Sequence, residues 1–389
     1  MQLNLLPHNE AALRIEKVRS AMAAQNLEAV LIADNANLYY LTGRVFAGYI
    51  YIPAIGETRC FVRRPVKTEG ENVIPIRKPE QISESIGSVA PSTIGLETDT
   101  LPYSLVLRLS AVFTGVEIGN ASAVMRQARA VKTTEEIKKI ETSGIKQTHV
   151  YSLIPSLFHE GMTDIELQIE IEKASRLEGC LGQFRIAGNS MELYMANLLS
   201  GDNADNPTPY DFAMGGEGLD PSLPVGCNGS IIRHGETVMA DINGNFTGYM
   251  TDMTRTFRVG QISPLAEKAH RCSIEICRRL ESEGKSGVKA SDLYSIAENM
   301  AREAGLHEYF MGHCQKAGFI GHGVGIEINE LPVIAPRSRD ILAENNVIAL
   351  EPKFVIPKTG AVGIENTYVV TADGLRKLTF APENLENLI

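Results

Sequence analysis

The chain has 389 residues, of which 44% are hydrophobic, and this is enough for large buried cores in roughly two or three domains. Its formal net charge at pH 7 is −10, with no cluster of lysine and arginine, which argues against nucleic acid or an anionic membrane surface as a partner. No apolar stretch approaches the roughly 20 residues of a membrane-spanning helix. No export signal is visible and the six cysteines form no CxxC pair, so we expect a reduced, cytoplasmic protein.

The N-terminal part of the chain has the pattern of an α/β domain. Ile15, Val18 and Met22 recur at helical spacing, and the segment EAVLIAD, residues 28–34, predicts a short buried strand. We expect the following NANLYYLTG, residues 35–43, to lead from a strand into a turn. Short apolar strands then alternate with helical stretches up to residue 130, and no catalytic group of side chains is visible among them.

A boundary near residue 130 separates this first domain, residues 1–130, from a second one, residues 131–389. Thr133 and Glu136 form a capping box, in which the threonine caps a new helix and the glutamate bonds back to the threonine backbone. Residues 163–166 repeat this pattern and predict a second helix that runs to about residue 178. Glycine-rich sequence and a β-hairpin follow, so this half has the order helix, helix, hairpin.

The same order recurs in the rest of the second domain. Ser263 followed by Pro264 favours a helix start, because proline is tolerated in the first helical turn, and Ser291 begins a shorter helix. A second hairpin follows these helices. Two helix–helix–hairpin halves predict a pseudo-symmetric α/β unit whose functional site lies where the two hairpins meet.

Each hairpin carries a pair of acidic residues. Asp241 and Asp252 flank a turn that we expect at residues 246–247, so that the two aspartates face each other across the hairpin. Glu351 and Glu365 flank a turn that we expect about Lys358, and they would face each other in the same way. Directly opposed Cβ atoms are roughly 4.5–5.5 Å apart. Four carboxylates on two adjacent hairpins could therefore hold two cations roughly 3.5–4 Å apart.

A cation would remove the cost of placing these carboxylates together, since like charges opposed across a sheet destabilise it. His322, between the glycines of GHGVGIE, adds one imidazole. Carboxylates with a single imidazole suit Mn, Fe, Co or Zn as two divalent ions better than a thiolate-type structural zinc. The alternative for either hairpin alone is an ordinary sheet with acidic residues on its solvent-exposed face.

Several of these segments resemble the pita-bread metallopeptidase family, which includes methionine aminopeptidase, Xaa-Pro aminopeptidase, prolidase and the metal-free creatinase. Residues 14–43 are similar to the N-terminal domain of the creatinase, prolidase and Xaa-Pro aminopeptidase branch. The segments GYMTDMTRTF, GHGVGIE, ALEPKF and GIENTYVVTADG resemble the metal motifs of the family. The resemblance implies an α/β (α+β) fold, with a creatinase-like N-terminal domain and a C-terminal pita-bread domain, in a homodimer.

The resemblance also implies roles for the acidic residues and for His322. Asp241 would be a terminal ligand of one metal ion, and Asp252 and Glu365 would bridge both ions. His322 and Glu351 would complete the second ion. In the family a metal-bridging water or hydroxide is the nucleophile, and Glu351 beside it would take and pass on protons.

The sequence departs from the family pattern at two histidines. Peptidases of the family commonly carry one histidine about 17 residues before the first metal aspartate and another seven residues after the metal histidine. Here these positions lie near Pro224 and at Asn329, and we expect Asn329 to contact the substrate. His313 and Arg255 are the remaining candidates for catalytic side chains, although His313 could also lie away from the cleft and Arg255 could be an exposed strand residue.

The leading interpretation is a dinuclear-metal hydrolase, an Xaa-Pro dipeptidase or aminopeptidase, that uses manganese or a similar ion on a small peptide or amide. A metal-dependent hydrolase of another C–N bond, in a small non-peptide metabolite, is the first alternative, because both accessory histidines are missing. A binding protein that kept the fold and lost catalysis is the second. Retention of five potential ligands argues against that second alternative.

Overall fold

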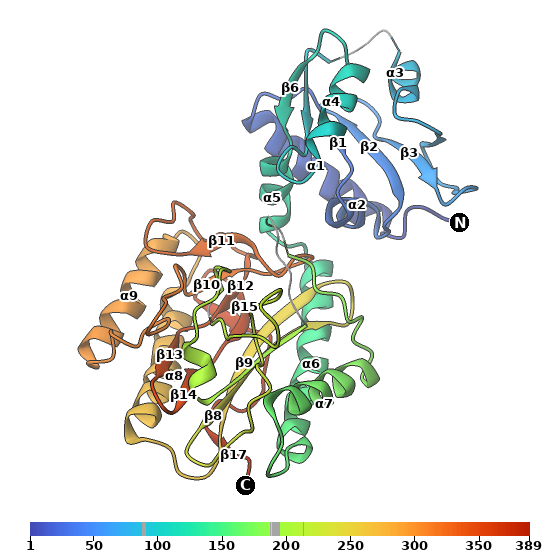
Figure 1. Ribbon diagram of the computed structural model, residues 1–389. Coiled ribbons are helices and arrows are strands. Elements are labelled where there is room, and N and C mark those ends of the chain that lie inside the picture. The colour runs from blue at the N-terminus through green and yellow to red at the C-terminus, as the bar shows by residue number, and fades with distance from the viewer. Residues whose placement is uncertain (88–90, 187, 189–194, 213) are drawn as a thin grey trace. The chain divides into compact units, whose positions relative to one another are not determined.

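The computed structural model describes residues 1–87, 91–186, 188, 195–212 and 214–389 (Figure 1). Within it the chain divides into two compact units, Met1–Arg129 and Ala130–Ile389, and each is described by itself. The sequence-based prediction placed the division between residues 130 and 131.

The N-terminal unit is built on a mixed six-stranded sheet with the order β4-β3-β2-β1-β5-β6. β1 pairs antiparallel with β2 and parallel with β5. Leu31, Phe61 and Leu109 are among the fully buried core residues. The strands are β1 (Ala29–Ile32), β2 (Ala47–Pro53), β3 (Arg59–Arg64), β4 (Val73–Pro75), β5 (Thr93–Leu96) and β6 (Glu117–Asn120). The helices are α1 (His8–Ala24), α2 (Asn35–Thr42), α3 (Gln81–Ile86), α4 (Tyr103–Val112) and α5 (Ser122–Ala130).

The segment after β1 corrects one prediction, because it is helix α2 and not a strand leading into a turn. Asp34 caps this helix by accepting a hydrogen bond from the Ala36 N–H, and Gly43 ends it in the left-handed conformation at φ 73°. These are standard helix start and stop signals. These two caps make the segment helical.

The C-terminal unit has the predicted order of helices and hairpins. Thr133 and Thr163 both form complete capping boxes, and Ser263 caps α8 with Pro264 in its first turn. The first half contains α6 (Thr134–Leu157), α7 (Asp164–Leu177), β7 (Ala196–Ser200), a 3-10 helix (Gly201–Asp205), β8 (Thr237–Asn245) and β9 (Met250–Arg258). The second contains α8 (Pro264–Glu283), α9 (Ala290–Glu303), β10 (Gly321–Gly323), β11 (Glu330–Ile334), β12 (Val347–Leu350), β13 (Lys353–Ile356), β14 (Gly360–Gly363), β15 (Asn366–Val370), β16 (Leu375–Lys377) and β17 (Glu386–Asn387).

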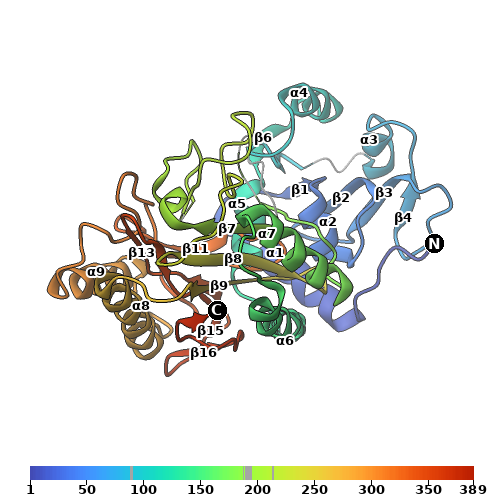
Figure 2. The ribbon, with the colours of Figure 1, turned by 60° about the horizontal axis from the view of Figure 1, so that its bottom comes forward.

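Helices cover the outer sides of the strands in both halves (Figure 2). One hydrophobic core joins α6 and α7 to β7, β8 and β9, and another joins α8 and α9 to β11 through β15. The strands form sheets of order β17-β9-β8-β7 and β11-β10-β12-β15-β16, together with the β13-β14 pair. Among the described residues, no helix is both long enough and apolar enough to cross a membrane.

One face of α6 holds the first hairpin in place through polar side chains. Ser143 Oγ donates to the Tyr249 carbonyl at 2.9 Å, and Gln147 accepts a hydrogen bond from Thr251 at 2.7 Å. Tyr151 OH donates to the Ala240 carbonyl at 3.1 Å. Residues spaced by four lie on the same helix face, so a single row of side chains fixes the hairpin that carries Asp241 and Asp252.

Candidate metal and substrate site

The first hairpin places its two aspartates on one face but not directly opposite each other. Asp241 is paired with Thr254, and Asp252 is paired with Asn243. The prediction of a directly opposed aspartate pair is therefore wrong by two residues. The turn lies further along the chain, where Gly248 adopts φ 83° and donates its N–H to the Asn245 side chain. A shift of two residues keeps both side chains on the predicted face, because side chains alternate along a strand.

The second hairpin has the predicted register. Lys353 is paired with Gly363 and Leu350 with Asn366, so Glu351 and Glu365 occupy matching positions between these pairs. Neither glutamate belongs to a strand. Their N–H groups donate instead to backbone carbonyls outside the hairpin, Glu351 to Ile320 at 2.9 Å and Glu365 to Thr254 at 3.1 Å. The strands of the second hairpin are thus interrupted at Glu351 and Glu365, and these backbone bonds tie the hairpin to neighbouring segments.

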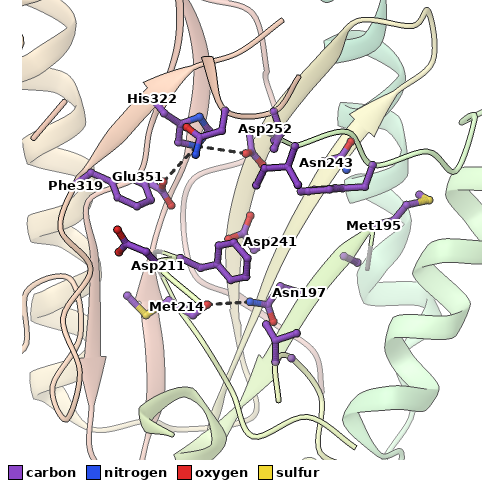
Figure 3. Close-up of a pocket in the computed structure, with 18 residues that line it drawn as sticks. Met195, Asn197, Asp211, Met214, Asp241, Asn243, Asp252, Phe319, His322 and Glu351 are labelled. Carbon is purple, nitrogen blue, oxygen red and sulfur yellow. Dashed lines mark hydrogen bonds and ion pairs between the residues drawn. The ribbon is translucent and has the colours of Figure 1, made fainter. Parts of the chain in front are cut away.

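His322 lies on β10, beside the carboxylates of Glu351 and Asp252 (Figure 3). Its Nε2 is 3.5 Å from Glu351 Oε1 and 3.7 Å from Asp252 Oδ2. Its Nδ1 is 3.1 Å from the Gly323 carbonyl, a position from which Nδ1–H can donate. In that tautomer Nε2 carries a free electron pair, and a neutral imidazole binds a metal through such a nitrogen.

The five residues expected as ligands come together in two overlapping groups. Potential donor atoms of Asp252, His322 and Glu365 lie within 4.8 Å of one another, and so do those of Asp241, Glu351 and Glu365. In the first group Glu365 Oε1 is buried and has no hydrogen-bond partner among the described residues, and a cation could bind this oxygen. Two carboxylates and an imidazole are suitable donors for a divalent transition-metal ion. The Asp252–His322–Glu365 group therefore fits a divalent ion.

The second group already holds a positive charge, on a residue that the sequence reasoning missed. Lys353 Nζ donates to Asp241 Oδ2 at 2.8 Å, to Glu351 Oε2 at 2.6 Å and to Glu365 Oε2 at 3.1 Å. The signal was present in the sequence, because a residue two positions after Glu351 on extended chain lies on the same face. As it stands, the Asp241–Glu351–Glu365 group does not fit a second divalent ion.

The buried carboxylates strongly perturb one another. Burial and the nearby Glu365 and Asp241 raise the pKa of Asp252 well above its usual range. Burial and Glu351 raise the pKa of Glu365 to about 8. For Glu351, burial raises the pKa, but attraction to Lys353 and His322 outweighs this effect and the net pKa is below the ordinary value. The raised pKa values mean that these carboxyls tend to keep their protons beside a single ammonium, and a bound cation would take the place of those protons.

A pocket opens over this cluster. Asp241, Asp252, His322 and Glu351 line it, and its walls include the apolar side chains of Phe184, Ile186, Phe212, Met214, Val225, Phe319 and Ile328. Asn329, expected to contact the substrate, is part of the lining, and its contact with a substrate stays a prediction. Asn243, a second residue that the sequence reasoning missed, also lines the pocket, and within the described part of the chain neither its Oδ1 nor its Nδ2 has a hydrogen-bond partner. The pocket combines apolar walls with three amide side chains, those of Asn197, Asn243 and Asn329.

Arg255 lies outside the pocket lining and is 3% exposed. Its guanidinium donates to the carbonyls of Glu365 at 2.8 Å and Ala381 at 2.7 Å, and to Asn366 Oδ1 at 2.7 Å. These contacts hold the backbone that presents Glu365. They indicate a positioning role, and neither the exposed-strand alternative nor a place in the cleft agrees with them.

His313 also lies outside the pocket lining. Its Nδ1 is 2.8 Å from Asp205 Oδ2, and the ring stacks on Tyr309 with centroids 5.8 Å apart. Asp205 also accepts the Cys314 N–H at 2.8 Å. The structure does not bring His313 together with the five clustered residues, so its catalytic role stays a prediction without geometric support.

Comparison with known proteins places this geometry in a family. The family model of the "Metallopeptidase family M24" matches residues 138–372, and that of the "Creatinase/Prolidase N-terminal domain" matches residues 14–131. The chain belongs to metallopeptidase family M24. It is thus a member of a metal-dependent hydrolase family, and the expected creatinase-type N-terminal and pita-bread catalytic folds are confirmed.

Relatives match along nearly the whole chain. An Xaa-Pro dipeptidase from Pyrococcus horikoshii is 29% identical over 374 residues, which cover 94% of this chain and 96% of the relative. The crystal structure of the prolidase from Pyrococcus horikoshii OT3 aligns with a TM-score of 0.78 at 25% identity and covers 97% of this chain and 99% of that one. The structure of an Xaa-Pro dipeptidase from Bacillus anthracis aligns with a TM-score of 0.81 at 23% identity over 97% of this chain and 99% of that one, and supports the fold alone.

Proposed function

We propose that this M24 protein hydrolyses the amide bond of a small substrate, first of all an Xaa-Pro dipeptide or the N-terminal bond of an Xaa-Pro peptide. The observation that carries the proposal is the buried cluster of Asp252, His322 and Glu365 beneath an apolar pocket. Relatives matched over nearly the full chain are named Xaa-Pro dipeptidases, which supports the same substrate class.

The residues of the pocket have distinct tasks in this proposal. A divalent ion held by Asp252, His322 and Glu365 would supply Lewis acidity and lower the pKa of water. Glu351 lines the pocket, and its carboxylate would take a proton from water and return it to the leaving amine. The apolar walls, including Phe319, would exclude water and receive a pyrrolidine ring.

The amide side chains provide orientation and not proton transfer. Among the described residues neither polar atom of the Asn243 side chain has a hydrogen-bond partner, and Asn329 lies in the same lining. Each can donate to a substrate carbonyl and accept from a substrate amine, but neither can gain or lose a proton near neutral pH. Binding would therefore be well served in this pocket, while general acid catalysis would rest on Glu351.

Asn329 also favours the second candidate function, a hydrolase of a C–N bond in a small non-peptide metabolite. A cyclic or guanidino amide has donors and acceptors that match two amide side chains. A non-catalytic binding protein is less well supported, because all five expected donors are retained and gathered within one cluster.

A substrate screen distinguishes these functions. Folded protein reconstituted with Mn²⁺ would be assayed against Xaa-Pro dipeptides, longer Xaa-Pro peptides, and cyclic or guanidino amides. We expect cleavage of Xaa-Pro dipeptides that is lost in Asp252→Asn. Turnover of the non-peptide amides alone would replace the first function with the second, and no turnover of any class by metal-loaded protein would contradict both.

Three further expectations belong to the same proposal. Manganese suits a donor set dominated by carboxylate oxygen, and a cytoplasmic location agrees with six cysteines that are all free. A homodimer would have twice the chain mass of 42.4 kDa, which light scattering measures. The expectation of two metal ions conflicts with Lys353, whose ammonium donates to Asp241, Glu351 and Glu365.

A further inference from the structure

Lys353 is fixed in a position from which its side chain can only point into the carboxylate cluster. It begins β13, where its backbone is paired with Gly363. Its carbonyl accepts the Met311 N–H at 2.9 Å, so the strand is held from a second side. The side chain is 0% exposed. Because side chains alternate along extended chain, Lys353 shares a face with Glu351.

The ammonium group of Lys353 has all of its donors satisfied by carboxylates. It carries three N–H donors and no acceptor. One carboxylate each from Asp241, Glu351 and Glu365 accepts, at 2.8, 2.6 and 3.1 Å. These are the three residues of the second donor group described above. The group that would hold one metal ion of a pair is therefore coordinated around an internal cation.

A metal ion cannot share this position with the ammonium. Transition-metal ions bind carboxylate oxygens at roughly 2.0–2.2 Å, so an ion on these oxygens would lie next to Nζ, which is 2.6–3.1 Å from them. Two positive charges so close in a buried site repel strongly. Lys353 itself is fully buried, and the two residues that follow it, Phe354 and Val355, are buried and apolar. An unpaired buried ammonium is very costly.

Glu365 shows how the cluster divides its oxygens between two cations. Its Oε2 accepts from Lys353 Nζ and from Thr254 Oγ1, at 3.1 and 2.7 Å. Its Oε1 is buried and has no hydrogen-bond partner among the residues that the structure describes. That free oxygen belongs to the residue that both donor groups share, and His322 Nε2 and Asp252 Oδ2 complete the other group.

We propose that the Lys353 ammonium takes the place of one metal ion, so that each chain binds a single divalent ion, among Asp252, His322 and Glu365. The site is then a mixed centre of one fixed ammonium and one exchangeable metal ion. This differs from the two-ion centre that the family resemblance implies. The inference concerns metal content and does not depend on which substrate is hydrolysed.

The number of metal ions bound per chain tests this proposal directly. Protein would be dialysed to equilibrium against Mn²⁺ and its bound metal counted by mass spectrometry, for the wild type, Lys353→Met and Lys353→Gly. We expect one ion per wild-type chain and a second ion in at least one Lys353 variant. Lys132→Met is the matched control, because Lys132 is also buried and ion-paired, with Glu330 at 3.0 Å, but contacts none of the five donors. It should bind one ion, like the wild type.

The wild type alone keeps the test decisive if the Lys353 variants do not fold. Electron paramagnetic resonance of Mn²⁺-saturated wild type should show an isolated ion and no spin-coupled pair. Two bound ions in the wild type, a coupled pair, or folded Lys353 variants that both stay at one ion would overturn the inference. One bound ion without hydrolysis would uphold it and contradict the proposed function, and hydrolysis with two bound ions would do the reverse.

Discussion

Asn329 is the residue in the pocket that bears most directly on specificity. Peptidases of the family commonly have a histidine at this position, and a histidine can transfer a proton near neutral pH, whereas an amide cannot. General acid or base assistance is typically worth about 10²–10⁴-fold in rate. Asn329 lines the pocket together with Glu351. His313 lies outside this lining, so it does not replace the proton transfer that a histidine at position 329 would provide.

We therefore expect slow cleavage of Xaa-Pro dipeptides by the wild type and faster cleavage by Asn329→His. The gain should be in kcat and reach roughly 10²-fold, because the new imidazole assists proton transfer. Steady-state kinetics on one dipeptide measures it, with Asn329→Gln as the control that restores no proton transfer. Fast wild-type turnover that Asn329→His damages would show that the pocket transfers the proton by another route.

His270 gives the stability of the C-terminal unit a defined dependence on pH. Burial lowers its pKa to about 4, and its Nε2 lies 2.8 Å from the Glu383 carbonyl. The pKa in the unfolded chain is about 6.5. Between these values the unfolded chain binds a proton that the folded chain does not. The contribution of neutral His270 to the free energy of unfolding is therefore complete above pH about 6.5 and is lost as the pH falls toward about 4.

This difference predicts that His270→Gln loses less stability on acidification than the wild type does. Glutamine keeps a donor for the Glu383 carbonyl and does not titrate. Between pH 7 and pH 5 the wild type should lose about 2 kcal/mol more than the variant. Urea unfolding followed by circular dichroism at both pH values measures the difference, and equal losses would show that His270 binds protons equally in the folded and unfolded states.

Helix α6 lies very close to the chain that follows β16. Gly144 lies within α6, where glycine is ordinarily less stable than alanine by about 0.5–1 kcal/mol. A Cβ atom at Gly144, however, would lie 2.1 Å from the Leu378 carbonyl oxygen. The helix contacts the chain after β16 so closely that no side chain fits between them.

Gly144→Ala should consequently destabilise the protein by roughly 1–3 kcal/mol, as overpacked positions do. Ser156→Ala, on the exposed side of the same helix, is the control and should change stability by less than about 0.5 kcal/mol. Thermal unfolding compares the two variants. A Gly144→Ala variant more stable than the wild type would mean that the helix can move away from Leu378.

Elements with strong local signals were predictable from sequence, and long-range placement was not. The capping boxes at Thr133 and Thr163 and the register of the second hairpin are local features, and all are confirmed. The first hairpin was wrong by two residues, because a chain rich in glycine and asparagine offers several turn positions. Lys353 escaped notice because lysine is not a metal ligand, and only the fold shows that it opposes three carboxylates.

On the scale of the whole molecule, all proposed metal donors belong to the unit of residues 130–389. A ligand that binds only the folded state stabilises it by about 2.7 kcal/mol at a hundred times its dissociation constant. The direct stabilisation by a metal ion should therefore fall on this unit.

Hydrogen exchange with and without Mn²⁺ tests this distribution. We expect slower exchange on adding the ion in β8, β9 and the segments around Glu351 and Glu365, and reversal by a chelator. Asp252→Asn should show no such protection. Protection that is equally large throughout residues 1–129, or that persists in Asp252→Asn, would place the ion elsewhere.

The claim that links structure to function is that one divalent ion beside the Lys353 ammonium suffices for hydrolysis. The most direct measurement titrates metal-free protein with Mn²⁺ while following cleavage of an Xaa-Pro dipeptide and the metal bound per chain. We predict that activity rises in proportion to bound metal and levels off at one ion per chain. Activity that levels off only at two ions, or no cleavage at any metal content, would contradict the account.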